Sequence, residues 1–252
     1  MKNLYLVANW KMNKTIAETN AFFDEFLLEN IKTKNHIVIC PSYLSIPKAV
    51  EKTAGTNIEI GAQNMHYAES GVWTGEVSPK MLTEVGAKYV IIGHSSRRAE
   101  DNETNEKINL KLKAALKNGL TPILCIGESA KEREAGRTYR VLKKQILWNF
   151  NEIEDPEKVI IAYEPLWAIS DGKNLQVVPT VEEIRAVNSG IKRVLRQIYT
   201  PEQVKKINIL YGGSVSDKNA REIMQERSVN GVLVGGASLN PQKFKNIIKA
   251  VN

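Results

Sequence analysis

The chain has 252 residues, of which 42% are hydrophobic and 25% charged, a composition typical of a soluble globular protein and a length that suits one large α/β domain or two small ones. Its only cysteines, Cys40 and Cys125, lie far apart in apolar runs, which excludes a disulfide scaffold and favours a reducing, cytoplasmic setting. The formal net charge of +7 favours anionic ligands, but the Lys and Arg residues are spread among Asp and Glu, which argues against a nucleic-acid-binding surface.

Eight short apolar runs, rich in β-branched residues, predict strands that are buried on both faces. In chain order they are Leu4–Ala8, His36–Cys40, Ile58–Ala62, Tyr89–Ile92, Thr121–Ile126, Val159–Tyr163, Ile207–Tyr211 and Gly231–Val234. The first run follows the N-terminus directly, without a signal or transit peptide, and no run approaches membrane-spanning length. We therefore expect no membrane partner.

Apolar residues at helical spacing predict a helix after each strand. The expected helix starts are Ser78-Pro79, a capping box from Thr180 to Glu183, Ser216 and Asn240-Pro241. The predicted inner faces include Ile16, Phe22, Phe23, Phe26 and Leu27 in the first helix, and Ile184, Val187, Ile191, Val194 and Ile198 in the helix after the sixth strand. Eight strand–helix units without a linker favour a closed (β/α)8 barrel over an open sheet, as a single α/β domain spanning residues 1–252.

The stretch Val159–Lys173 places a lone carboxylate, Glu164, at the end of a buried strand. Pro165 ends that strand because proline has no N–H for the ladder and keeps the preceding residue extended. Residues 166–173 are too apolar for an ordinary loop and contain a glycine near their far end, which suggests a lid that docks over a ligand. The alternative is a buried turn whose Glu is satisfied by hydrogen bonds, and this segment alone favours neither.

Polar residues follow several predicted strands at the rim where (β/α)8 barrels build their active sites. Asn9 and Lys11 follow the first strand, His94 follows the fourth and Glu164 the sixth. A lone histidine at a strand end is more often structural than catalytic, and we expect that of His36 and His66.

Paired glycines follow the last two strands, Gly212-Gly213 and Gly235-Gly236. One such pair is usually a turn, but two on adjacent strands can bring backbone N–H groups close to an anion. A base, an imidazole, an ammonium group and a phosphate cradle at one rim are what proton transfer next to a carbonyl requires.

Six motifs resemble those of triosephosphate isomerases, in order and over the whole chain. They are Asn9-Trp10-Lys11-Met12-Asn13, Gly93-His94-Ser95, Cys125-Ile126-Gly127-Glu128, Ala162-Tyr163-Glu164-Pro165-Leu166-Trp167-Ala168-Ile169, Tyr211-Gly212-Gly213-Ser214-Val215 and Leu233-Val234-Gly235-Gly236-Ala237-Ser238-Leu239. The resemblance implies an isomerase of glycolysis and gluconeogenesis that interconverts dihydroxyacetone phosphate and D-glyceraldehyde 3-phosphate through an enediolate, without cofactor or metal.

The resemblance also implies a role for each rim residue. Glu164 would be the base, His94 would polarise the carbonyl, and Lys11, assisted by Asn9, would supply positive charge to the substrate. The backbone N–H groups expected to hold the phosphate are those of Ser170, Ser214, Gly235 and Gly236.

The same resemblance assigns residues to lid support and to assembly. Glu128 would accept the indole N–H of Trp167, and Tyr211 would also support the lid. The loop from Gln63 to Glu76, with Trp73 and Thr74 near its tip, would insert into a second subunit of a homodimer.

The sequence departs from the family pattern in two places. Ser96 stands where the family normally has a Glu that helps anchor the lysine equivalent to Lys11; we expect another acid at the rim to replace it, and Glu103 is a poorer candidate. The lid ends Ser170-Asp171-Gly172-Lys173 instead of Gly-Thr-Gly-Lys, and an apparent insertion, residues 174–177, follows. Two alternatives therefore stay open: a barrel that acts on another phosphosugar, and a catalytically weakened member of the same family with a mainly binding role.

Overall fold

Parallel strands close into a barrel in chain order, with β1 paired to both β2 and β8. The computed structural model describes residues 3–29, 31–169 and 178–252. The strands within it are β1 (Tyr5–Asn9), β2 (His36–Cys40), β3 (Ile58–Ala62), β4 (Tyr89–Ile92), β5 (Thr121–Ile126), β6 (Ile160–Tyr163), β7 (Ile209–Tyr211) and β8 (Gly231–Val234). The closed (β/α)8 barrel is therefore confirmed, and each strand begins and ends within two residues of its predicted bounds.

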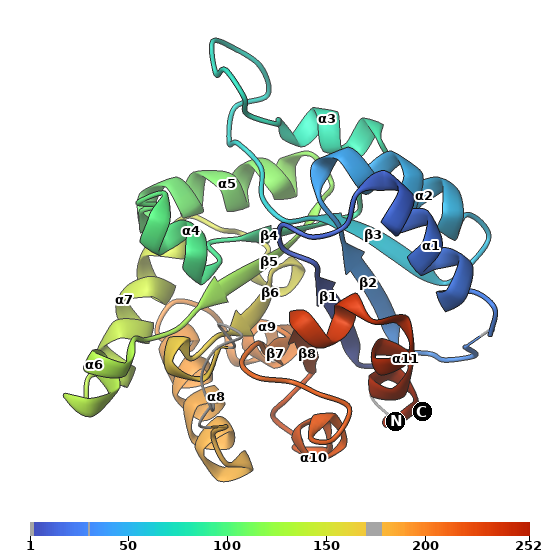
Figure 1. The fold of residues 1–252 in the computed structure, drawn as a ribbon. Coiled ribbons are helices and arrows are strands. Elements are labelled where there is room, and N and C mark those ends of the chain that lie inside the picture. Colours follow the sequence, from blue (N-terminus) through green and yellow to red (C-terminus); the bar gives the residue numbers. More distant parts are fainter. Residues whose placement is uncertain (1–2, 30, 170–177) are drawn as a thin grey trace.

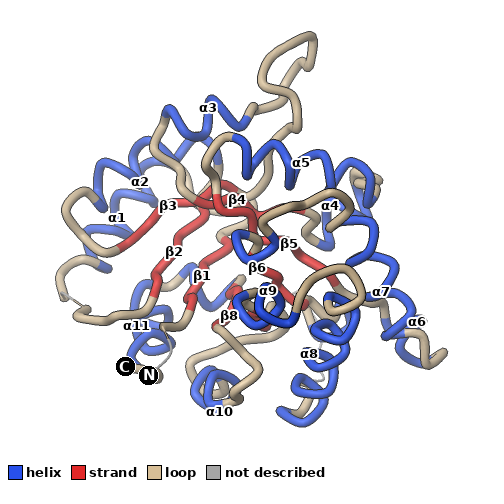
Figure 2. Tube along the Cα trace, turned by 180° about the vertical axis from the view of Figure 1, so that it is seen from behind, coloured by secondary structure: helices blue, strands red, loops and turns tan. Residues whose placement is uncertain are grey.

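Helices form a ring around the strands, as Figure 2 shows from behind. They are α1 (Ile16–Phe26), α2 (Ile46–Thr53), α3 (Pro79–Glu84), α4 (Ser95–Glu100), α5 (Asn105–Lys117), α6 (Ala130–Glu134), α7 (Thr138–Asn149), α8 (Val181–Leu195), α9 (Pro201–Lys206), α10 (Ala220–Gln225) and α11 (Pro241–Lys249). Short 3₁₀ turns also occur at Tyr43–Ser45, Pro156–Lys158, Leu166–Ala168 and Gly236–Leu239. Among the described residues, no helix is long and apolar enough to cross a membrane.

The strands are buried on both faces, as their continuous apolar sequences predict. Along β1, Leu6 and Ala8 belong to the large core between strands and helices, whereas Val7 belongs to a separate cluster. That cluster takes residues from most of the strands, among them Val38, Ile91 and Leu233. Because side chains alternate along a strand, each strand fills the barrel interior with one face and holds its helices with the other.

Three predictions about the helices were wrong. Ile16 begins α1 but is 49% exposed, and Ile198 is 42% exposed because α8 already ends at Leu195. Ser216 does not cap α10, which begins at Ala220; its hydroxyl instead accepts the Lys218 N–H at 3.3 Å within the preceding turn. The capping box at Thr180 and the caps at Ser78 and Asn240 are present as predicted.

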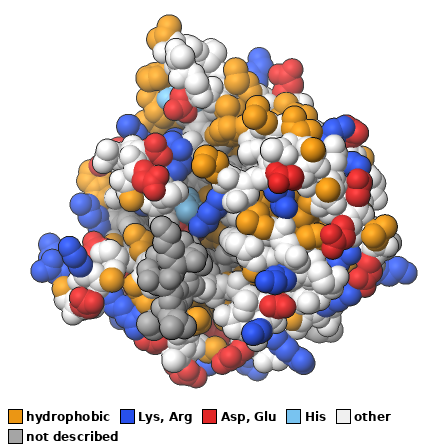
Figure 3. Space-filling model, in the orientation of Figure 1, with side chains coloured by type: hydrophobic (Ala, Val, Ile, Leu, Met, Phe, Trp, Pro, Cys, Tyr) orange, Lys and Arg blue, Asp and Glu red, His pale blue; other side chains and the backbone are white. Residues whose placement is uncertain are grey.

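The loop between β3 and α3 projects from the barrel at the top of Figure 1. Large apolar side chains on this loop are exposed, including Val72 at 98% and Trp73 at 47%. On the face in Figure 3, hydrophobic side chains gather over this part of the molecule.

Candidate active site

A cavity of about 280 Å³ opens at the C-terminal ends of the strands. Its lining includes Asn9 from β1, Lys11 from the loop after it, His94 after β4 and Glu164 after β6. The remaining lining residues are Ile169, Gly212, Gly213, Ser214, Val215, Leu233, Gly235, Gly236, Ala237 and Lys243. The barrel thus brings the sequence-predicted rim residues to one cavity, although they are spread over most of the chain.

Glu164 is held in a space that two glycines leave open. Its backbone N–H donates to the Ile126 carbonyl at 2.8 Å, so the residue continues the pairing of β6 with β5. A Cβ on Gly212 would lie 2.7 Å from Glu164 Cγ, and one on Gly127 would lie 1.8 Å from the Glu164 carbonyl oxygen. Larger residues at either position would therefore displace the carboxylate from the rim.

The carboxylate of Glu164 is buried, with only 3% of the residue exposed, yet its polar contacts are long. Oε2 lies 3.4 Å from the backbone N–H donor of Ser95, and Oε1 lies 3.5 Å from His94 Nε2. A buried carboxylate with such contacts keeps lone pairs directed at the cavity, as a proton acceptor requires.

His94 caps the N-terminus of α4 with its own side chain. Its Nδ1 accepts the backbone N–H of Ser96 at 3.2 Å and lies 2.9 Å from the Ser96 hydroxyl oxygen. Because Nδ1 must present a lone pair to the backbone N–H, the hydrogen is assigned to Nε2. That Nε2–H faces Glu164 and the cavity, where it can donate to a substrate oxygen.

Lys11 has a backbone in the left-handed region, with φ of 54°. Its N–H donates to Asn9 Oδ1 at 3.0 Å, and its side chain passes close to Gly235, where an added Cβ would lie 3.5 Å from Lys11 Cε. Within residues 3–29, 31–169 and 178–252, no carboxylate lies within 4.0 Å of the Lys11 ammonium. The acid that we expected to replace the family Glu is therefore not found in the described part of the chain.

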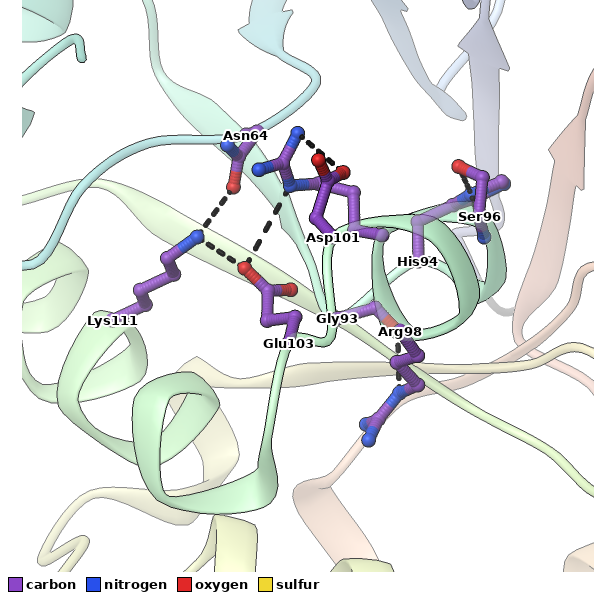
Figure 4. Close-up of polar contacts among 9 residues, drawn as sticks. Asn64, Gly93, His94, Ser96, Arg98, Asp101, Glu103 and Lys111 are labelled. Carbon is purple, nitrogen blue, oxygen red and sulfur yellow. Dashed lines mark hydrogen bonds and ion pairs between the residues drawn. The ribbon is translucent and has the colours of Figure 1, made fainter.

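Glu103 is engaged elsewhere, as Figure 4 shows. It forms an ion pair with Lys111, and its Oε1 lies 3.7 Å from Arg97 Nε. Lys111 also donates to Asn64 Oδ1 at 2.8 Å. In Figure 4 this cluster lies away from His94 and Ser96.

The glycine-rich segments after β7 and β8 form one wall of the cavity. Ser238 fixes the second segment, because its hydroxyl donates to the Gly235 carbonyl at 2.7 Å and also lies 3.1 Å from the Val234 carbonyl. Lys243, in the first turn of α11, also lines the cavity. Lys243 was not predicted, because its sequence neighbourhood shows only an amphipathic helix with an apolar inner face. Ser170, expected to hold the phosphate, lies outside the described residues.

Glu128 joins two elements beneath the cavity. Its Oε1 accepts the indole N–H of Trp167 at 2.9 Å and the Tyr163 hydroxyl at 3.1 Å. Burial raises the pKa of the Tyr163 hydroxyl, so it remains a donor. The guanidinium of Arg133 lies 3.5 Å from the centre of the Trp167 ring. Tyr163 and Arg133 were not predicted; an apolar strand and a charged helix gave no sign of their contacts.

Tyr211 is fully buried at the end of β7, and its hydroxyl fits against Gly213, where an added Cβ would lie 2.2 Å away. Burial raises its pKa as well. Its predicted role in supporting the lid, residues 166–173, stays a prediction, since residues 170–173 lie outside the described residues.

Trp73 and Thr74 lie in the projecting loop and do not line the cavity. The Trp73 ring packs on His66 with centroids 4.5 Å apart, and His66 in turn stacks on Tyr67 at 4.3 Å. His36 stacks on Tyr5 at 4.4 Å. Both histidines make the structural contacts that we expected of them.

The described residues contain no group of three or more His, Cys, Asp or Glu side chains that could hold a metal ion. Cys125 is buried in β5, and burial, with a contribution from Glu164, raises the pKa of its thiol. It is therefore a core residue in the described structure.

Comparison with known proteins identifies relatives along the whole chain. A family model described as triosephosphate isomerase matches residues 4–251. A triosephosphate isomerase of Dictyoglomus thermophilum is 44% identical over 253 residues, covering 99% of this chain and 100% of that protein. One from Clostridium botulinum strain Loch Maree is 43% identical, covering 98% and 99% of the two chains, and one from Aquifex aeolicus is 44% identical, covering 96% and 97%.

Proposed function

Because the chain belongs to the triosephosphate isomerase family, we propose that it interconverts dihydroxyacetone phosphate and D-glyceraldehyde 3-phosphate. The observation that carries this proposal is the pairing of Glu164 with His94, 3.5 Å apart in a cavity that Lys11 and two glycine-rich segments also line.

In the proposed reaction, Glu164 takes the proton from the carbon beside the carbonyl and returns it to the neighbouring carbon. The His94 Nε2–H donates to the oxygen on which negative charge develops, and Lys11 lies on the same cavity with its positive charge. The backbone N–H groups of the segments at Ser214, Gly235 and Gly236 bind the phosphate, with the N-terminus of the 3₁₀ turn Gly236–Leu239 beside it. The hydroxyl proton moves at the same time from one of the two neighbouring oxygens to the other, with the His94 imidazole as its carrier, so the reaction takes up and releases no proton overall.

A coupled assay tests this proposal directly. Glyceraldehyde 3-phosphate is supplied, and its conversion to dihydroxyacetone phosphate is followed through reduction of the ketone by a dehydrogenase. We expect turnover, and we expect inorganic phosphate to inhibit it competitively. No turnover, together with retained phosphate binding, would favour the weakened, binding member of the family; turnover only with other phosphosugars would favour a different substrate.

We also propose that the protein is a cytoplasmic homodimer. Trp73 and Val72 are exposed apolar side chains on a projecting loop, and exposed apolar side chains of this kind are commonly covered by a partner. A two-fold dimer would bury this loop against the same surface of a second copy.

Trp73→Asp is expected to shift the protein toward monomer, because an isologous interface places the new charge in both copies. Sedimentation velocity measures the shift, and the coupled assay should show reduced activity in the same samples. Tyr139→Asp, at an exposed aromatic on α7, is the control and should leave the assembly unchanged. A stable monomer for the unmodified protein would disprove the dimer.

A further inference from the structure

We propose that Gln63 is the positioning residue for Lys11, and that it holds the catalytic ammonium through the backbone instead of through an ion pair. This inference rests on the proposed function, since it concerns how the isomerase site is preorganised. Gln63 follows β3 directly, so its amide begins at the end of a barrel strand, which is a rigid point of attachment.

The Gln63 side chain bonds to two backbone carbonyls. Its Nε2 donates to the Lys11 carbonyl at 2.8 Å and to the Cys40 carbonyl at 3.0 Å. Both partners are acceptors, so the amide can only be oriented with its NH₂ group toward them. The two hydrogens of one NH₂ group thereby connect the chain segments that leave β1 and β2.

These bonds fall on a residue whose conformation needs support. Lys11 has φ of 54°, a region that side chains other than glycine occupy at a cost and that persists where surrounding contacts determine it. Its N–H is held by Asn9 Oδ1 at 3.0 Å and its carbonyl by Gln63. Contacts on both sides of the residue therefore fix the direction in which its side chain leaves the backbone.

The described residues provide no alternative anchor at the ammonium end, because no carboxylate among them lies within 4.0 Å of it. The stem instead passes Gly235, where an added Cβ would lie 3.5 Å from Lys11 Cε, an ordinary van der Waals distance. The charge is thus positioned by a fixed backbone, while the ammonium keeps its hydrogen bonds available for an anionic substrate.

Cys40 makes the arrangement more rigid. Its carbonyl accepts both the Trp10 N–H at 3.1 Å and the Gln63 amide. Trp10 is therefore bonded directly to the end of β2, and Lys11 is connected to it through Gln63. Gln63 is separated from Lys11 by 52 residues, which is why the sequence gives no sign of this role.

The test is a double-mutant cycle between Gln63 and Lys11. Gln63→Met keeps the length of the side chain and removes both donors, and it should lower kcat/KM by about tenfold or more, because small displacements of a charged group in a site cost that much. In a Lys11→Met background, where no ammonium remains to be positioned, the same Gln63→Met change should alter the residual kcat/KM by less than about twofold. Residual turnover is measured at high enzyme concentration.

Asn35→Leu is the matched control. Asn35 Oδ1 accepts the Leu4 N–H at 3.0 Å, so this amide ties down the other end of the β1 segment without approaching the cavity. Its loss should change kcat/KM by less than about twofold. If Gln63→Met does not fold, Gln63→Asn retains the donors on a shorter side chain that cannot reach both carbonyls, and the same cycle applies.

The inference is overturned if Gln63→Met stays within twofold of the parent. It is equally overturned if the change lowers activity by the same factor with and without Lys11, since that is the pattern of a general structural role. Failure of the proposed function would appear differently, as absence of isomerase turnover in the unmodified protein.

Discussion

Glu103 and Glu164 are both buried carboxylates, with 6% and 3% of the residue exposed, but their surroundings are opposite. Glu103 is paired with the Lys111 ammonium and lies near the Arg97 guanidinium (Figure 4). Glu164 has no Lys or Arg partner within 4.0 Å among the described residues; it contacts an imidazole and a backbone N–H at long range and interacts with the buried Cys125 thiol. A buried charge that is paired serves the fold, whereas one that is left without a cation beside a cavity is available for chemistry.

The largest expected effect comes from removing the unpaired charge. Glu164→Gln keeps the size of the side chain but not the proton acceptor, so kcat should fall by about a hundredfold or more. The free energy of unfolding should not decrease, because a buried carboxylate without a cation costs stability. The coupled assay and urea unfolding measure the two quantities.

Binding of inorganic phosphate serves as the control for this variant and should survive, because the glycine-rich segments are untouched. Turnover within about tenfold of the parent, roughly 1.4 kcal/mol of barrier, would show that Glu164 is not the base.

Removing the paired charge of Glu103 should instead lower the stability and leave the activity nearly unchanged. Glu103→Gln removes the negative charge beside Lys111 and leaves the buried ammonium with amide oxygens as its partners; loss of one charge of a buried pair costs about 3 kcal/mol of unfolding free energy. Activity of the folded fraction should remain within about threefold, since the cluster does not line the cavity.

The double change Glu103→Leu with Lys111→Met sharpens this prediction. Replacing both partners by apolar residues should cost less than removing one, because no buried charge is left alone. If Glu103→Gln reduced activity as severely as Glu164→Gln while the protein remained folded, the contrast between the two carboxylates would be wrong.

The two carboxylates also show what could be predicted from the sequence. The strands, and Glu164 at the end of one of them, were predictable because buried parallel strands have continuous apolar sequences and a barrel gathers their ends. The pairing of Glu103 with Lys111 was not, because Glu103 lies in a polar connection between two helices and Lys111 among the ordinary charged residues of α5.

Contacts between distant residues explain most of what was missed. Gln63 reaches Lys11 over 52 residues and Trp167 reaches Glu128 over 39; only the second was expected, through resemblance to a family. Ser216 has the chemistry of a cap, but the turn after it delays α10 until Ala220. The residue type of Ser216 shows that it can cap a helix, but it does not determine where the next helix begins.

The smallest expected effect concerns Ser96, where the family normally has Glu. The Ser96 oxygen lies 2.9 Å from His94 Nδ1, so Ser96→Glu would remove a contact to the imidazole while offering Lys11 a carboxylate. Ser96 is exposed, and an exposed ion pair contributes less than about 1 kcal/mol. Loss of the hydroxyl contact costs about the same. The two effects oppose each other, and kcat/KM should change by less than about tenfold, or 1.4 kcal/mol.

Ser96→Ala is the matched control, since it removes the hydroxyl without adding charge; the ratio of kcat/KM between the two variants isolates the contribution of the carboxylate. A gain of about a hundredfold in Ser96→Glu would show that Lys11 is poorly positioned in this chain, and it would contradict the support from Gln63 at the same time.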